Sequence, residues 1–142
     1  MSKLETPMTI LFWHQVGGLL IEEFVVVRRT ASQGQRLIDA VIVLGEKKRR
    51  LPRGAEFDLA GRDVIAVQSK HRQLGMALAG QTVFSKELLK RFKPRSIRSV
   101  AVCTVVMQCC GRFWSGTRAV RCGCIWRGRR GGGGSEGARR WG

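Results

Sequence analysis

Three polar side chains on two apolar segments could together act on a phosphodiester bond. Asp39 interrupts the apolar segment 36–44, and Gln68 and Lys70 stand two residues apart at the end of the segment 63–70. Because side chains alternate along a strand, Gln68 and Lys70 should share one face of a sheet. A carboxylate, an amide oxygen and a backbone carbonyl suit Mg²⁺, and a lysine can stabilise charge on a phosphate or orient the attacking water. The spacing therefore predicts a metal-dependent phosphodiesterase site.

Each of these residues also has an ordinary interpretation. Asp39 could face solvent on an edge strand or pair with Arg36, and Lys70 could be a lysine in water at a strand end. An acid inside an apolar strand is costly to bury unless it is paired or bound to a metal. If segments 36–44 and 63–69 pair as strands, Asp39 meets Gln68 at the strand ends. This pairing would favour the metal-site interpretation over the ordinary one.

Hydrophobic periodicity predicts the elements that position these residues. Apolar residues recur at steps of three and four over 8–24, which indicates a helix that ends at Glu22 and Glu23. Either glutamate could add a metal ligand from there, or both could belong to a solvated helix end. A second helix is predicted over 73–92, where Pro94 ends it, and Gln81 on this helix could support the site.

Four strands are predicted around the two helices. They cover residues 25–29, 36–44, 63–69 and 96–103, with a loop over 45–62 that contains several glycines and a proline. The resulting order is α-β-β-β-α-β. We therefore expect a single α/β domain with a mixed sheet over residues 1–104.

This element order, with Asp39 on the second strand and Gln68-Ser69-Lys70 on the third, resembles the PD-(D/E)XK nuclease superfamily, which has the restriction-endonuclease-like fold. The resemblance covers about residues 8–104 and includes an Arg-x-x-Asp approach to Asp39. It implies that Asp39 is the motif acid, that Gln68 and Lys70 match the catalytic triplet, and that Glu22 or Glu23 matches the acid of the first helix. It also implies Mg²⁺ or Mn²⁺ as cofactor and DNA cleavage as activity.

The chain departs from this family pattern at Gln68, where most members have a carboxylate. Relatives of enzymes that restrict methylated DNA also use Gln-x-Lys, so the residue is compatible with catalysis. It nevertheless removes one negative charge from the metal site. A catalytically inactive nuclease-fold protein that binds nucleic acid or a protein partner is therefore the alternative function.

The charge balance indicates an anionic partner. The chain has 26 Lys and Arg against 10 Asp and Glu, which favours nucleic acid, DNA ahead of RNA, over a membrane surface. No secretory signal and no membrane-spanning run is apparent, so a cytoplasmic location with reduced thiols is expected, and a homodimer remains possible. Two basic runs could contact phosphates; they contain Lys47, Lys48, Arg49, Arg50, Lys90, Arg91, Lys93 and Arg95.

The composition changes beyond residue 104. Residues 105–142 contain eight arginines, one carboxylate and the run Gly131–Gly134, which predicts a disordered, basic tail. Its cysteines lack a C-x-x-C pair and a nearby histidine, which argues against a zinc site. Abundant Trp, Cys, Gly and Arg are typical of GC-rich DNA read in a wrong frame. One choice of codons, read one nucleotide earlier, encodes GGDAVLRPLLERYPGCAVRVYLAG, and a non-functional frameshifted copy is thus a further alternative.

Overall fold

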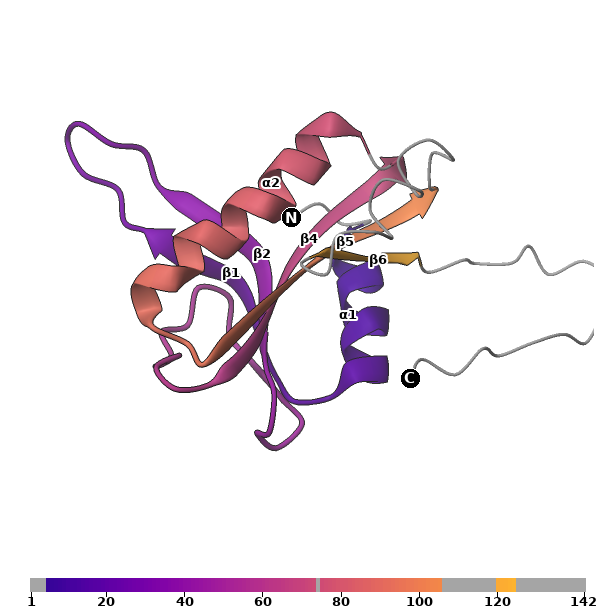
Figure 1. Cartoon of the computed structure of the whole chain (residues 1–142), viewed down its shortest axis with the longest axis horizontal. Helices are drawn as coiled ribbons and strands as arrows, with labels where there is room; N and C mark the ends of the chain where they lie inside the picture. The colour runs from indigo at the N-terminus through magenta and orange to yellow at the C-terminus, as the bar shows by residue number, and fades with distance from the viewer. Residues whose placement is uncertain (1–4, 74, 106–119, 125–142) are drawn as a thin grey trace, which may run out of the picture.

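The computed structural model describes residues 5–73, 75–105 and 120–124, which form a twisted sheet with a helix on each side (Figure 1). The strand order is β3-β1-β2-β4-β5-β6, and antiparallel and parallel pairs are mixed. The elements in chain order are α1 (Glu5–Val16), β1 (Leu19–Val27), β2 (Arg36–Val43), β3 (Arg49–Leu51), β4 (Asp63–Gln73), α2 (Met76–Leu89), the 3-10 helix η1 (Lys90–Phe92), β5 (Ser96–Val105) and β6 (Val120–Cys124).

Each face of the sheet carries its own apolar cluster. On one face, Met8 and Trp13 of α1 pack with residues such as Ile42 and Val67. On the other face, Leu89 of α2 packs with residues such as Val64. Because both faces of the central strands are covered, these strands consist of continuous apolar runs, as the sequence indicated for 63–69. The predicted α/β domain with a mixed sheet is confirmed.

The predicted helix over 8–24 is wrong in its second half. Helix α1 ends at Val16, and residues 19–24 belong to β1, which extends to Val27 in place of the predicted strand 25–29. Gly17 and Gly18 have φ angles of 78° and 81°, a conformation that stops a helix. The two glycines therefore act as the stop signal between α1 and β1.

Other boundaries differ by smaller amounts. The second helix is shorter than the predicted 73–92, because β4 continues to Gln73 and the chain tightens into η1 after Leu89. The predicted loop 45–62 contains β3, which pairs parallel with β1 rather than in a hairpin. No helix in the described part of the chain is long and apolar enough to cross a bilayer.

Strand β6 belongs to the segment whose composition predicts disorder. Val120–Cys124 pairs parallel with β5, with Ser99 opposite Val120. The remaining residues of 106–142 lie outside the described part of the chain. In the alternative reading frame the same five positions would hold Cys-Ala-Val-Arg-Val, a better strand sequence because it has no glycine and alternates apolar residues. The frame hypothesis therefore stays a prediction. Sequencing the gene across codons 100–130 tests it, and the absence of a coherent frame after a one-base shift near codon 105 would refute it.

Gly18 is predicted to tolerate no side chain. A Cβ atom on Gly18 would lie 2.4 Å from the Val43 carbonyl oxygen, whereas a Cβ atom on Gly17 would meet nothing within 4 Å. Gly18→Ala should therefore lower the free energy of unfolding by about 3 kcal/mol, since it adds a steric clash to a left-handed φ. The matched Gly17→Ala should cost about 1 kcal/mol, because only the φ is unfavourable. Urea unfolding of both variants measures the difference, and equal losses would contradict the assigned contact.

Candidate active site

A cavity of about 270 Å³ lies where β2 and β4 meet α2. Asp39 contributes from β2, Gln68 and Lys70 from β4, and Gln81 from α2. The structure thus brings together side chains about 30 residues apart that the sequence singled out for phosphate chemistry. We refer to this space, lined also by Arg36, Leu37, Ser69, Phe84, Ser85 and Leu88, as the Asp39 cavity.

Asp39 lies on an interior strand, half-buried, rather than on an edge. The β2–β4 ladder runs from Val43 opposite Val64 to Ala40 opposite Val67. Beyond this last pair, Oδ2 of Asp39 accepts hydrogen bonds from the Ser69 backbone N–H at 2.8 Å and the Ser69 hydroxyl at 3.3 Å. The carboxylate therefore continues the strand contact where backbone pairing ends, and Ser69 holds it at the cavity.

The orientation of the Gln68 amide follows from a chain of hydrogen bonds. The Ser85 hydroxyl donates its single hydrogen to the Gln81 carbonyl oxygen at 2.7 Å, one turn earlier on α2. It can then only accept from Gln68, whose Nε2 lies 2.6 Å away. Gln68 is buried, so the amide nitrogen is committed to Ser85 and the amide oxygen is the atom left for a ligand.

The charge at the Asp39 cavity is favourable for a phosphate. Lys70 and Arg36 are exposed at its edge, and within the described chain neither forms an ion pair. Among the described residues, Asp39 is the one carboxylate that lines the cavity. Two cations against one anion leave a local positive charge, which attracts a phosphodiester.

Glu22, a predicted metal ligand, lies elsewhere. It is on β1 and not at a helix end, and its side chain is fully buried. Its Oε2 accepts a hydrogen bond from Nε of Arg50 at 2.5 Å and forms an ion pair with Nη2 of the same guanidinium, also at 2.5 Å. A buried carboxylate needs such a charged partner. Glu22 is therefore a structural residue that fixes β3 to β1 and not a ligand at the Asp39 cavity.

Glu23, predicted as a catalytic and metal-binding residue, also lies on β1. Its φ of 51° makes an irregularity in the strand between the pairs Glu22–Ala40 and Phe24–Ile38. This position is opposite Asp39, but Glu23 does not line the Asp39 cavity, and its Oε1 lies 3.5 Å from Arg53. The predicted ligand set of Asp39, Gln68, Glu22 and Glu23 is thus not assembled, and the described residues contain no group of three or more His, Cys, Asp or Glu side chains suited to a metal.

The first predicted DNA-binding run lies at the opposite end of the sheet. Arg49 pairs with Leu19 at the start of β1. Asp39 lies opposite Glu23 in the middle of β1, and the cavity extends from there to Arg36, which pairs with Val27 at the end of β1. Lys48 bonds the His14 carbonyl oxygen and lies over the Trp13 ring at 5.5 Å. Arg50 is committed to Glu22. All four residues of this run are exposed, but only Lys47 and Arg49 form no side-chain hydrogen bond or ion pair within the described chain.

Much of the second run is also engaged within the protein. Lys90 pairs with Glu87 at 2.6 Å. Arg95 forms a forked ion pair with Asp63, and this pair, with the Ser96 hydroxyl, holds the pKa of Asp63 well below its usual range. Asp63 and Lys70 are seven residues apart on β4, about 23 Å. Lys93 is exposed at the same end as Asp63. None of the four predicted residues of this run, Arg91 included, lines the Asp39 cavity.

Sequence reasoning missed two serines that organise the cavity. Ser69 was expected to face away from the site, yet its backbone and hydroxyl both hold Asp39. Ser85 lies four residues after Gln81, on the same face of α2. That spacing was the available signal, but it points to the site only once α2 is known to cover the end of β4.

Comparison of the chain with protein-family models, curated proteins and solved structures gave no match.

Substitutions at Ser85 and Gln68 test the amide orientation. If the Gln68 amide oxygen is a metal ligand, Ser85→Ala in the parent chain frees the amide to rotate and present its nitrogen to the cation, and Mn²⁺ affinity should fall about tenfold. Gln68→Glu should tighten Mn²⁺ binding, because it adds a carboxylate. In that background, Ser85→Ala should have little effect, since both oxygens of a carboxylate can bind the metal.

Titration calorimetry with Mn²⁺ on the four proteins measures the coupling between the two positions. Ser85→Thr retains the hydroxyl and serves as the conservative control. Thermal melting identifies any loss of fold. An equal loss of affinity from Ser85→Ala in both backgrounds would mean that Ser85 acts through general stability and not through the amide.

Proposed function

We propose that this protein is a Mg²⁺-dependent nuclease that hydrolyses phosphodiester bonds in DNA at the Asp39 cavity. The observation that carries the proposal is that Asp39, Gln68 and Lys70 line one cavity. Their placement on β2 and β4 agrees with the motif positions that the resemblance to PD-(D/E)XK nucleases implies.

The donor atoms at the cavity are compatible with Mg²⁺. A carboxylate offers about four acceptor sites, so the hydrogen bonds from Ser69 to Asp39 and metal binding can coexist. The Gln68 amide presents its oxygen because Ser85 holds its nitrogen. Mg²⁺ is commonly held by one or two carboxylates together with substrate phosphate and water. When bound here, the ion would neutralise charge on the scissile phosphate.

The protein's own residues supply the remaining requirements. Lys70 is placed to stabilise the negative charge that develops on the phosphate oxygens, since it shares the face of β4 with Gln68. Arg36, across the cavity on β2, would bind the phosphate by its forked donors and orient the substrate. Asp39, held by Ser69, would fix the position of the metal relative to both cations.

A second function has a specific observation in its favour. The Asp39 cavity has a single carboxylate among its described lining residues, because Gln68 replaces the usual acid and Glu22 is committed to Arg50. A protein that keeps the positive cavity without a strong metal site would bind nucleic acid but not cleave it. This non-catalytic module is the competing proposal.

Cleavage assays on plasmid and linear DNA with Mg²⁺ or Mn²⁺ distinguish the two functions. Asp39→Asn and Lys70→Met should each reduce the cleavage rate by about a hundredfold or more, because each removes charge stabilisation at the reacting phosphate. Lys47→Met is the matched control. It removes the same charge from an exposed lysine at the other end of the sheet, and it should leave the rate within about twofold.

Activity that survives both site substitutions would refute the proposed site. No cleavage by the parent chain, together with tight and salt-sensitive DNA binding, would instead establish the non-catalytic module. Chelation of the metal with EDTA should abolish cleavage if the nuclease proposal is correct.

A further inference from the structure

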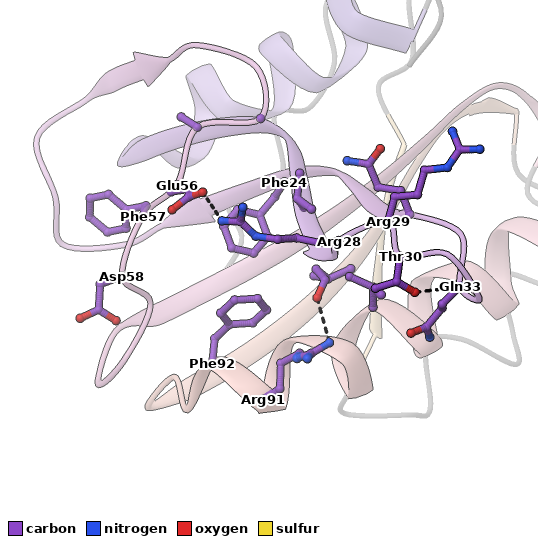
Figure 2. Close-up of a pocket in the computed structure, with 16 residues that line it drawn as sticks. Phe24, Arg28, Arg29, Thr30, Gln33, Glu56, Phe57, Asp58, Arg91 and Phe92 are labelled. Carbon is purple, nitrogen blue, oxygen red and sulfur yellow. Dashed lines mark hydrogen bonds and ion pairs between the residues drawn. The ribbon is translucent and has the colours of Figure 1, made fainter.

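A second and larger cavity lies beside the Asp39 cavity, between the end of β1, residues 54–58 and η1. Its volume is about 1070 Å³, which is ample for a small organic ligand. Figure 2 shows the ring of Phe92 in the middle of this space, with the Arg28 side chain above it and Arg91 beside it. We call it the arginine–phenylalanine pocket and define it by Arg28, Arg29, Phe57, Arg91 and Phe92.

The phenylalanines give the pocket an aromatic wall. Phe92 packs edge-on against the buried Phe24, with ring centroids 5.2 Å apart and an interplanar angle of 67°. Phe92 and Phe57 are only partly buried, so both rings contribute to the pocket surface. An aromatic ring fixed from behind in this way offers a π-face on which a planar base can stack.

The arginines give the pocket positive charge, and they are only weakly engaged. Arg28 pairs with Glu56, but these side chains are 77% and 78% exposed, and such a pair contributes little stability. Arg91 donates to the Val26 carbonyl oxygen at 3.0 Å. Arg29 is exposed and forms no ion pair within the described chain. On the acidic side, Asp58 caps a turn by accepting from the Ala60 N–H at 3.0 Å.

The two cavities share a wall. Val25 and Val27 line the arginine–phenylalanine pocket, and their partners across the β1–β2 ladder, Leu37 and Arg36, line the Asp39 cavity. On the other side, Leu88 lines the Asp39 cavity one turn before Arg91. A polymer that crosses this wall can therefore contact both spaces.

We propose that the arginine–phenylalanine pocket binds an unpaired DNA strand next to the Asp39 cavity, with a base stacked on Phe92 and phosphates on Arg28 and Arg29. The aromatic wall favours an unpaired strand over a duplex, because bases inside a duplex already stack on each other. The inference rests on the proposed function, since it takes the strand to be part of the nuclease substrate.

Fluorescence anisotropy with the full chain and EDTA tests the pocket in the absence of cleavage. The probes are a labelled oligodeoxynucleotide and the duplex made from it. Arg29→Ala should weaken binding of the single strand about fivefold and reduce the slope of log K against log[NaCl] by about 0.7, the value for one lost phosphate contact. Phe92→Leu should weaken binding of the single strand by about fivefold or more, because it removes stacking but keeps an apolar side chain. Binding of the duplex should be unchanged.

Arg62→Ala is the matched control, because Arg62 is an exposed arginine just before β4, at the end of that strand away from the Asp39 cavity, and it belongs to neither basic run. It should change neither probe. Any binding by residues 106–142 is common to all variants and cancels in the comparison. Equal effects of Arg29→Ala and Arg62→Ala would overturn the proposal, as would equal weakening of single-strand and duplex binding by Phe92→Leu. If Phe92→Leu lowers the melting temperature too far for measurement, Arg29→Ala alone decides.

Failure of this inference is distinguishable from failure of the nuclease proposal. Selective loss of single-strand binding in Arg29→Ala, in a chain that cleaves no DNA, would support the pocket and refute the nuclease. Metal-dependent cleavage with unchanged single-strand binding in Arg29→Ala would support the nuclease and overturn the pocket.

Discussion

The antiparallel pairing of β2 with β4 is the constraint on which the candidate site depends. Ala40 lies opposite Val67, and this register places Asp39 beside Ser69 and brings Gln68 and Lys70 to the same cavity. A slip of one residue would turn every side chain of the strand to the other face. The register is enforced because both faces of these strands are buried, with Val41, Ile42 and Val64 fully inaccessible. The apolar core therefore positions the polar site.

In the described part of the chain, most carboxylates are paired with arginines. The buried Glu22 pairs with Arg50 of the edge strand β3, Asp63 pairs with Arg95, and Glu56 pairs with Arg28 at the surface. The Glu22–Arg50 pair explains why the predicted ligand set is incomplete. A fully buried carboxylate is stable only beside a charged partner, so Glu22 stays with Arg50. At Asp39, Oδ2 accepts hydrogen bonds from the backbone N–H and the hydroxyl of Ser69. These contacts fix the position of the carboxylate at the Asp39 cavity.

The order of elements was predictable because hydrophobic periodicity follows directly from burial. Strands β2 and β4 and helix α2 overlap the predicted segments 36–44, 63–69 and 73–92, although β4 runs on to Gln73 and α2 is shorter than predicted. The end of the first helix was not predictable from this periodicity. Leu19, Leu20 and Ile21 continue an apolar pattern that suits a helix and a buried strand equally well. The left-handed conformation of Gly17 and Gly18 decides between them. Because of this ambiguity between helix and strand, Glu22 and Glu23 were predicted at a helix end, whereas they lie on β1.

The sequence by itself determined which residues could do chemistry: an acid inside an apolar strand, and an amide and a lysine on one face of the next. It did so because alternation along a strand is local and needs no partner. Only the tertiary structure decided which of them share a cavity, that Ser69 holds Asp39, and that Ser85 orients Gln68. These contacts join residues that are 17 and 30 positions apart, so they arise from strand register and helix packing, which no local pattern encodes. The same holds for the arginine–phenylalanine pocket, whose walls come from β1, residues 54–58 and η1.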